Sequence, residues 1–381
     1  MRVLLTGGGT GGHIYPALAV ARRLKEMEED VTILYVGTER GLESRIVPEE
    51  NIAFRSIEIE GFKRNLNLEG IKYNFRSIGL FFKSIRESKK IIKEFKPDVV
   101  LGTGGYVSAP IGYAAAKAGV PTIIHEQNSY LGLTNKFLIR YIDRLAISFE
   151  DVLDQVSGHE DKVVFTGNPR AQEVSKTGMP MIDTIYGLNV TKPIVLIFGG
   201  SRGAAKINEA VIEAYPRLVT RDYQIIFVTG EHYFEDVTRQ LNAIAPLKNN
   251  PHFVVKPYIH NMINVLRHSS LIISRSGATT IAEITVLGVP SILIPSPNVT
   301  EDHQTKNAMS LVNNQAAILL KEADLNAESF LREIDYVMTN SSIRQSMGER
   351  ALELGQPFAT DQLIQVMLDE IRRKSLTQSY K

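Results

Sequence analysis

The sequence has no cysteine, and this absence excludes disulfide bonds, thiolate metal sites and a cysteine nucleophile. It also has no Asp-x-Asp pair that could hold a divalent ion. Its formal net charge is only +1, because 43 Lys and Arg residues nearly balance 42 Asp and Glu residues. Bulk charge therefore does not indicate nucleic acid or another polyanion as a partner. The chain begins without an apolar leader, so we expect no export.

Long apolar runs of the kind that cross a membrane are also missing. Two uncharged stretches, 99–116 and 284–300, are interrupted by glycine and proline residues. A membrane-spanning helix needs about 20 predominantly apolar residues. We therefore predict that both stretches are strand–loop–helix segments of a globular α/β protein and that the chain does not span a membrane.

One abundant feature is glycine near the start, in "LLTGGGTGGHIYPALAV", where five of the six residues Gly7–Gly12 are glycine. Glycine is entropically costly, so this loop predicts a close approach of the backbone to a ligand. An apolar strand precedes it, and apolar residues then recur at helical spacing from Ala17 to Met27. A second apolar strand follows at 31–36, which completes the β–loop–α–β unit of a parallel sheet.

The same pattern returns almost half a chain later. A strand at 194–198 leads into the loop Gly199–Gly203, a helix with apolar residues from Ile207 to Leu218, and a strand at 225–228. The fold class that this repeat predicts is α/β, with two Rossmann-like, doubly wound parallel-sheet domains facing a cleft. We place them at residues 1–165 and 166–355, and we expect ligands beyond the carboxyl ends of the strands.

The glycine loop has two competing interpretations. Gly7-x-Gly9-x-x-Gly12 matches the dinucleotide fingerprint, which would indicate an NAD-type oxidoreductase. That fingerprint needs an acidic residue about 20 positions further on, but position 32 is threonine and Glu39 is only a loose candidate. The glycines could also serve only a tight strand-to-helix turn. A non-catalytic protein that binds a sugar nucleotide or docks on a membrane is a third hypothesis.

Further polar signals follow the predicted strands. They include "GTGGY" after the strand at 99–102, "HEQN" at 125–128, and "SRSG" at 274–277. "HEQN" is not a zinc-protease motif, because Ser129 stands where a second histidine would be needed. Since the carboxyl ends of parallel strands share one edge, we expect these groups to line a ligand site.

Seven motifs taken together resemble the MurG family of peptidoglycan N-acetylglucosaminyltransferases. They are "LLTGGGTGGHIYPALAVA", "GTGGYVSAP", "HEQNSYLGLTN", "GNPR", "FGGSRGA", "SRSGATTIAEI" and "HQTKNA", in this order from Leu4 to Ala308. The resemblance implies a GT-B fold and inverting transfer of N-acetylglucosamine from UDP-N-acetylglucosamine. The acceptor it implies is the 4-hydroxyl of the N-acetylmuramoyl-pentapeptide on undecaprenyl diphosphate (lipid I). It also implies no cofactor, no metal, and a peripheral position on the cytoplasmic face of the bacterial membrane.

The resemblance also assigns binding residues. The donor set is Thr10, Gly11, Gly12, Asn128, Arg170, Ser201, Ile259, Ala278, Thr279, Glu283 and Gln304, and the acceptor or diphosphate set is Gly104, Gly105 and Tyr106. Within the donor set, Ile259 would meet the uracil through its backbone, and Glu283 would accept hydrogen bonds from the ribose hydroxyls. One departure affects sugar selectivity: the family often has two adjacent glutamines where this chain has His303 and Gln304.

The transfer needs a base to take the proton from the attacking hydroxyl. His13 is our candidate, because histidine titrates near neutral pH and this one ends the first glycine loop. Glu126 and His125 are rival candidates, since sequence does not reveal geometry. His13 could instead bind the acceptor diphosphate or cap the loop.

A basic amphipathic segment predicts contact with an anionic membrane surface. Residues 62–96 contain ten Lys or Arg and three Glu, a local net charge of +7. The membrane candidates are Phe81, Phe82, Lys83, Arg86, Lys89 and Lys90. The alternative is that the apolar stripe packs into the first domain; we expect Ile85, Ile92 and Phe95 to point inward and part of 80–82 outward. By analogy with GT-B enzymes, we expect the helix at about 356–381 to cross back to the first domain; the alternative is a plain terminal helix of the second.

Overall fold

The computed structural model describes residues 1–61, 68–176, 184–200 and 202–379. The chain divides into two compact units. Unit 1 comprises Met1–Gln172 together with Phe358–Lys381, and unit 2 comprises Glu173–Pro357. The division falls after Gln172 rather than after residue 165, because the segment that follows the last strand of unit 1 is held there by Thr360, whose Oγ1 donates to the carbonyl of Pro169 at 2.8 Å.

Unit 1 is built on one parallel sheet of seven strands. The strands are β1 (Arg2–Thr6), β2 (Thr32–Gly37), β3 (Ala53–Ser56), β4 (Val99–Gly102), β5 (Thr122–Glu126), β6 (Arg144–Ile147) and β7 (Val163–Phe165). Their order across the sheet is β3-β2-β1-β4-β5-β6-β7. In register, Val3 lies between Ile33 on β2 and Val99 on β4. The strand–loop–helix–strand unit that the sequence predicts is therefore confirmed.

Helices cover both faces of this sheet. They are α1 (Gly11–Met27), α2 (Glu43–Glu49), α3 (Leu68–Phe95), α4 (Ser108–Lys117), α5 (Leu133–Leu138) and α14 (Ala359–Ser379), whereas α6 (Pro169–Lys176) spans the division at Gln172. Alternate residues of β1 enter opposite cores: Val3 and Leu5 pack with α1 and α14, whereas Leu4 packs with α3 and α4. Burial on both faces explains why the strands are almost continuously apolar.

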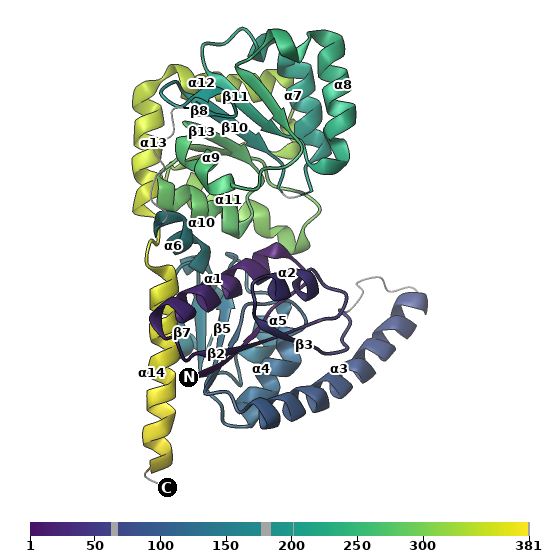
Figure 1. Ribbon diagram of the computed structural model, residues 1–381, viewed down its shortest axis with the longest axis vertical. Coiled ribbons are helices and arrows are strands. Elements are labelled where there is room, and N and C mark those ends of the chain that lie inside the picture. The colour runs from purple at the N-terminus through teal and green to yellow at the C-terminus, as the bar shows by residue number, and fades with distance from the viewer. Residues whose placement is uncertain (62–67, 177–183, 201, 380–381) are drawn as a thin grey trace. The chain divides into compact units, whose positions relative to one another are not determined.

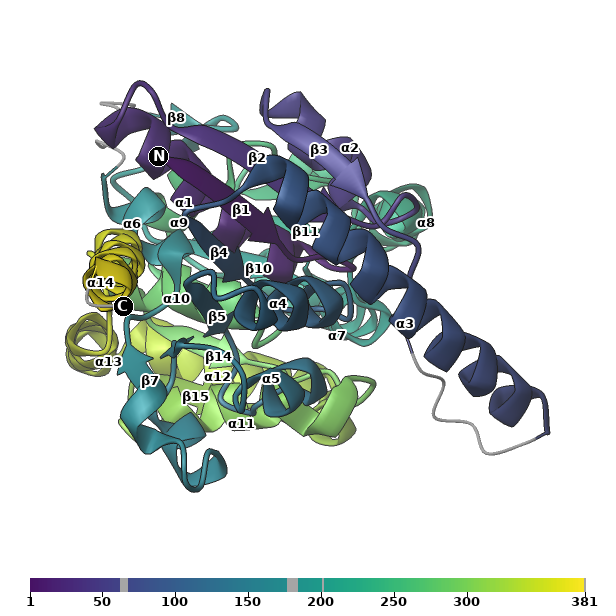
Figure 2. The same cartoon turned by 90° about the horizontal axis from the view of Figure 1, so that it is seen from below.

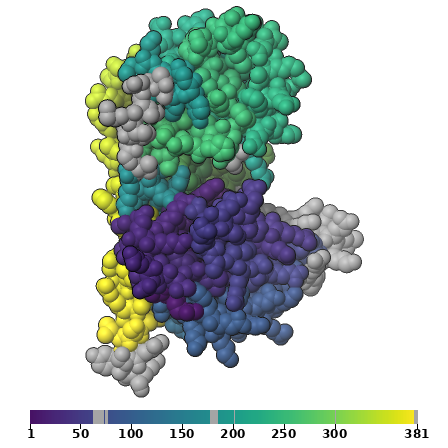
Figure 3. Space-filling model, in the orientation of Figure 1, coloured from purple at the N-terminus to yellow at the C-terminus, as the bar shows by residue number. Residues whose placement is uncertain are grey.

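The C-terminal helix α14 belongs to unit 1, where it lies along the flank of the sheet (Figure 1) and forms part of the surface (Figure 3). Leu363, Ile364 and Met367 are fully buried in the same core as Val3 and α1. Polar contacts add to this packing, since Glu370 accepts hydrogen bonds from Arg144 at 2.7 Å and Arg373 at 2.6 Å. The last segment of the chain thus completes the core that its first segment begins.

Unit 2 repeats this architecture with a parallel sheet of six strands in the order β12-β11-β10-β13-β14-β15. These strands are β10 (Ile194–Phe198), β11 (Gln224–Val228), β12 (Phe253–Lys256), β13 (Leu271–Ser274), β14 (Ser291–Leu293) and β15 (Ala317–Leu319), and a hairpin of β8 (Thr184–Ile185) and β9 (Leu188–Asn189) precedes them. The helices are α7 (Ala205–Leu218), α8 (Phe234–Ile244), α9 (Met262–His268), α10 (Ala278–Leu287), α11 (His303–Val312), α12 (Ala327–Thr339) and α13 (Ser341–Glu353). The predicted repeat is confirmed.

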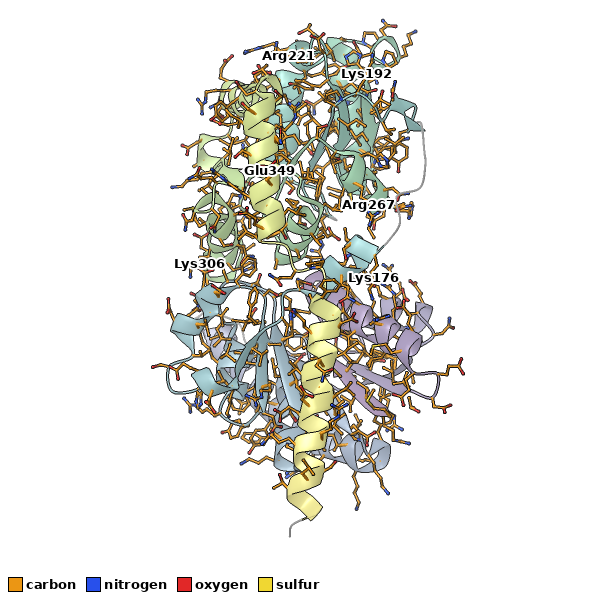
Figure 4. All side chains as sticks on the ribbon, turned by 90° about the vertical axis from the view of Figure 1, so that its left-hand side faces the viewer. Lys176, Lys192, Arg221, Arg267, Lys306 and Glu349 are labelled. Carbon is orange, nitrogen blue, oxygen red and sulfur yellow. The ribbon has the colours of Figure 1, made fainter. Side chains whose placement is uncertain are left out.

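The two ends of the unit 2 sheet carry different residues. In Figure 4, Arg221 and Lys192, which precede β11 and β10, lie at one end of the unit, and Lys306 of α11 lies at the other. The loops that leave β10, β12, β13 and β14 therefore gather at the end marked by Lys306, which is the carboxyl edge of the sheet. Ligands of doubly wound sheets bind at this edge.

Candidate active site

The first glycine loop connects β1 to α1 at the carboxyl edge of the unit 1 sheet. Helix α1 begins at Gly11, so Gly11, Gly12 and His13 form its first turn, and Thr10 precedes it in an extended conformation. Gly9 has a φ of +85°, which favours glycine. The Gly8 N–H donates to the carbonyl of Gly104 at 3.3 Å, and this bond joins the loop to the one that follows β4. The structure thus brings together Thr10, Gly11, Gly12 and His13 with Gly104.

The imidazole of His13 is held in one orientation by the loop itself. Its Nδ1 lies 2.9 Å from the carbonyl oxygen of Gly8 and 3.4 Å from the Thr10 hydroxyl. A carbonyl oxygen can only accept, so Nδ1 carries the hydrogen in that bond and Nε2 of a neutral ring carries the lone pair. A Cβ at position 104 would lie 3.0 Å from Nε2, so the glycine there leaves room beside this nitrogen.

The loop after β4 supplies Gly104, Gly105 and Tyr106. Gly105 has a φ of +79°, and a Cβ there would lie 2.5 Å from the carbonyl oxygen of Gly8. The Tyr106 side chain is 39% exposed. Burial, and then the negative charge of Glu43, raise the pKa of the Tyr106 hydroxyl, so this group remains a neutral hydrogen-bond donor at physiological pH.

His125 is fully buried, and both of its ring nitrogens are engaged. Nε2 donates to the carbonyl of Gly167 at 2.9 Å, and Nδ1 accepts from the Gln127 amide at 2.9 Å. Burial lowers the pKa of His125 to about 4, although the hydrogen bond to Gly167 by itself raises it. Proton uptake at Nδ1 would break the bond from Gln127. His125 therefore ties β5 to the segment after β7.

Glu126 is also enclosed by hydrogen-bond donors. Its two carboxylate oxygens accept from the N–H groups of Asn128 at 3.0 Å and Gly132 at 2.9 Å, and from the Asn135 amide at 2.8 Å. A weaker bond comes from the Asn128 amide at 3.3 Å. The carboxylate thus folds residues 128–135 into a turn, which fixes Asn128 at the end of β5.

The donor candidates of unit 2 lie after strands β10, β12, β13 and β14. Gly199–Gly203 follows β10, Ile259 follows β12, Ala278 and Thr279 open α10 after β13, and Gln304 lies in the first turn of α11. Position 201 falls outside the described residues. The helices α7 and α10 begin after Ala204 and Gly277, so no side chain at the cap position competes with a ligand for their first N–H groups.

Two further donor candidates have buried surroundings. Glu283 is 8% exposed on α10. The Gln304 Oε1 accepts from the Ser296 N–H at 2.8 Å, and the Ser276 hydroxyl donates to the Gln304 carbonyl at 2.7 Å. These bonds orient the amide of Gln304 and connect the loops after β13 and β14. The remaining donor candidate, Arg170, falls in unit 1, because α6 begins before the division at Gln172.

Several supporting residues were not found by sequence reasoning. Arg275 donates to the carbonyls of Ile294 at 3.1 Å and Pro295 at 3.0 Å, and it pairs with Glu322. Asn208 donates to the carbonyl of Thr229 at 3.1 Å, beside the second glycine loop. Arg275 lies inside the motif "SRSG", which was a usable signal. For Asn208 the sequence gives no signal, because an amide one turn into a helix looks solvent-exposed.

Helix α3 runs beside α4 and extends well beyond it at its N-terminal end (Figure 2). Ile92 is buried and Phe82 is 63% exposed, so the predicted inward and outward directions are confirmed for these two. Phe81, Ile85 and Phe95 are half-buried. The Phe81 ring contacts the ring of Phe137 on α5, and the two centroids lie 5.9 Å apart.

Basic residues follow Phe82 along α3. Lys83, Arg86, Lys89 and Lys90 are all exposed. The Lys83 ammonium lies 2.5 Å from Glu58, and Lys90 lies 3.9 Å from Glu94. Exposed pairs of this kind are screened by water and contribute little to stability, so both lysines can reorient toward another anion.

The described residues contain neither a membrane-spanning helix nor a cluster of metal-binding side chains. Among them no helix is long and apolar enough to cross a membrane. Outside 62–67, 177–183, 201 and 380–381, no group of three or more His, Asp or Glu side chains is placed to bind a metal ion.

Comparison with known proteins agrees with this geometry. The glycosyltransferase family 28 N-terminal domain matches residues 3–147, and the family 28 C-terminal domain matches residues 194–363. The chain is 54% identical over 366 residues to the UDP-N-acetylglucosamine--N-acetylmuramyl-(pentapeptide) pyrophosphoryl-undecaprenol N-acetylglucosamine transferase of Latilactobacillus sakei, covering 96% of this chain and 99% of that protein. It is 50% identical over 375 residues to the Bacillus subtilis transferase of the same name, covering 98% and 100%.

A solved structure gives the same result. The crystal structure of Acinetobacter baumannii MurG matches with a TM-score of 0.74 at 28% identity, covering 97% of this chain and 99% of that one. The fold and the family 28 domains define a glycosyltransferase with the GT-B architecture of two parallel-sheet units. The chain belongs to the MurG family of N-acetylglucosamine transferases.

Proposed function

We propose that this chain transfers N-acetylglucosamine from UDP-N-acetylglucosamine to the 4-hydroxyl of the muramoyl sugar of lipid I, with inversion, to give lipid II. Two relatives whose names state this transferase activity are 54% and 50% identical to the chain over nearly its full length, and this supports the proposal. The observation that carries the chemistry is the bond between His13 Nδ1 and the Gly8 carbonyl, which leaves Nε2 as a proton acceptor.

The proposed step is a single displacement. His13 Nε2 takes the proton of the acceptor hydroxyl while that oxygen bonds to the anomeric carbon of N-acetylglucosamine. The bond from this carbon to the diphosphate oxygen breaks, and its electron pair leaves with UDP. The Gly8 carbonyl stabilises the imidazolium by accepting from Nδ1. His13 is favoured over its rivals because both nitrogens of His125 are engaged and Glu126 already accepts four hydrogen bonds.

We assign donor recognition mainly to unit 2. The diphosphate would be bound by N–H groups at the starts of α7 and α10, with Ser201 and Arg170, because such groups stabilise a developing anion. Glu283 would accept from the ribose hydroxyls, and Ile259 would meet the uracil. Gln304, Thr279 and Asn128 would bind the sugar and its phosphate. Gly104, Gly105 and Tyr106 would bind the acceptor diphosphate.

We also propose that the enzyme binds the cytoplasmic face of the cell membrane through α3. The lipid-linked acceptor requires such contact, and Phe82 is exposed among Lys83, Arg86, Lys89 and Lys90. An aromatic ring can enter the interface while each nearby cation contributes about 1 kcal/mol of attraction to anionic lipid.

Calorimetric titration followed by a transfer assay tests the function. UDP-N-acetylglucosamine should release binding heat, NADH should release none, and a lipid I analogue should gain one N-acetylglucosamine. Heat with NADH alone would restore the oxidoreductase hypothesis, and donor binding without transfer would support a non-catalytic protein. Comparison with the galactose epimer of the donor shows whether His303 weakens sugar selection.

A further inference from the structure

Glu43, the first residue of α2, is a fully buried carboxylate beside the first glycine loop. Its Oε1 accepts from the Thr38 N–H at 3.0 Å and from the Thr38 hydroxyl at 2.7 Å. Its Oε2 accepts from the Gly9 N–H at 3.1 Å. A buried charge is costly unless donors surround it, so these three bonds are what allow the carboxylate to remain there.

The glycines around Glu43 leave the space that it fills. A Cβ at Gly8 or at Gly41 would overlap the Glu43 carboxylate oxygens. The bare backbone of the first loop is therefore used partly to enclose a side chain of this same protein. This use differs from approach to a ligand, and it gives the loop an internal anchor.

The anchor leads directly to the candidate base. Glu43 holds the N–H of Gly9, and the carbonyl of the preceding residue, Gly8, accepts from His13 Nδ1 at 2.9 Å. The same peptide segment is also held by the Tyr35 hydroxyl, which donates to the Gly7 carbonyl at 2.8 Å. Rotation of the Gly8–Gly9 peptide group would remove both the Glu43 bond and the His13 bond.

We propose that Glu43 is a positioning residue for catalysis: it fixes the Gly8–Gly9 peptide so that the Gly8 carbonyl orients His13 and keeps its hydrogen on Nδ1. This inference rests on the proposed role of His13 as the base. Glu43 itself touches no reacting atom. Besides burial, the negative charge of Glu43 raises the pKa of Tyr106, the acceptor-side candidate of the neighbouring loop, whereas the hydrogen bond between Thr38 and Tyr106 lowers it.

An amide cannot replace this carboxylate. Glutamine has one oxygen and one NH2 group, whereas the three donors approach both oxygens of Glu43. In either orientation of the amide, its NH2 group faces an N–H donor, either that of Gly9 or that of Thr38. Glu43→Gln should therefore release the loop while changing the side-chain volume very little.

The test combines turnover with the tautomer of His13, measured by ¹⁵N NMR and assigned with His13→Gln. In the wild type the neutral ring should carry its hydrogen on Nδ1. In Glu43→Gln this tautomer should become mixed, and kcat should fall about 10- to 100-fold while KM for UDP-N-acetylglucosamine changes less than about twofold. Glu49→Gln, an exposed site on the same helix, is the matched control and should leave both unchanged.

Thr38→Val removes the hydroxyl donor to Glu43 and keeps the side-chain shape, so it is the second test variant if Glu43→Gln does not fold. It should shift the His13 tautomer and lower kcat in the same direction as Glu43→Gln, but by less. An unchanged His13 tautomer in these variants would overturn the inference, whatever happens to kcat. A mixed tautomer with wild-type kcat would support the anchor and would instead refute His13 as the base.

Discussion

The Nδ1 atom of His13 and the carbonyl oxygen of Gly8 are 2.9 Å apart, although five positions separate the two residues in the chain. Helix α1 starts between them, so the first turn of the helix brings its own histidine back over the loop. The hydrogen of the neutral ring is then assigned by the chemistry of the carbonyl, and Nε2 is the nitrogen left for proton transfer.

Replacement of His13 tests this assignment. His13→Ala should lower kcat by about 10²- to 10⁴-fold, the usual contribution of a positioned general base. Donor affinity should change little, because the proton is taken from the acceptor. Turnover assays and calorimetry with UDP-N-acetylglucosamine measure the two effects. Wild-type turnover in the variant would eliminate His13 as the base, and an equal loss of donor affinity would assign it to donor binding.

The exposed aromatic ring of α3 can be tested with lipid vesicles. Phe81→Ser combined with Phe82→Ser should weaken binding to anionic vesicles and leave binding of UDP-N-acetylglucosamine intact. Phe358→Ser is a suitable control, because Phe358 is 63% exposed, as Phe82 is, but lies outside α3. Vesicle co-sedimentation at low and high salt gives the readout. Equal binding by the double variant and the wild type would contradict the membrane assignment.

His125 should make stability depend on pH. Its pKa is about 4 in the folded protein, below the ordinary value of 6.5, because burial disfavours the charged ring. The unfolded chain therefore binds more protons between these two values. Above pH 6.5 the neutral ring carries no penalty, and as pH falls from 6.5 toward 4 stability is lost at about 1.4 kcal/mol per pH unit.

Denaturant unfolding across that pH range checks this expectation. His125→Gln should be less stable than the wild type at pH 7, since it loses buried bonds, but its stability should fall less steeply with acid. A slope identical to that of the wild type would show that another group causes the acid sensitivity.

The ion pairs of α14 give a prediction about stability. Glu370 is 3% exposed and accepts from both Arg144 and Arg373. Glu370→Gln should lower the free energy of unfolding by about 1–3 kcal/mol, less than for a fully buried pair because both guanidinium groups reach solvent. Asp369→Asn, whose exposed carboxylate pairs with Arg372, should change it by less than about 0.5 kcal/mol. Denaturant midpoints of the two variants measure these changes. Equal midpoint shifts for Glu370→Gln and Asp369→Asn would refute the argument from burial.

The fold was predictable because its signals are local. The apolar strand 194–198 and the helical spacing from Ile207 to Leu218 specify their elements without help from distant residues. Motifs at strand ends then fell on one edge of each sheet, since parallel strands all end at the same side. Loops rich in glycine were easy to find because a run of glycines is also a local signal.

The supporting contacts were not predictable. Glu43 lies in "GLESR", a polar stretch typical of a solvated helix start, yet it is fully buried because Gly8 and Gly41 leave room for it. His125 and Glu126 resemble an acid–base pair in sequence, but His125 bonds the distant Gly167 carbonyl, and Glu126 is occupied by the donors of the turn that follows it, including Asn135. Burial and the folded geometry of these hydrogen bonds decide the roles, and neither is encoded in the spacing of residue types.

The position of α14 also has a consequence for the order in which the protein is made. Leu363, Ile364 and Met367 fill the core that surrounds β1, so Met1–Gln172 of unit 1 waits with an incomplete interior while the ribosome produces all of unit 2. Loss of α14 would leave the sheet of unit 1, rather than that of unit 2, without part of its hydrophobic covering.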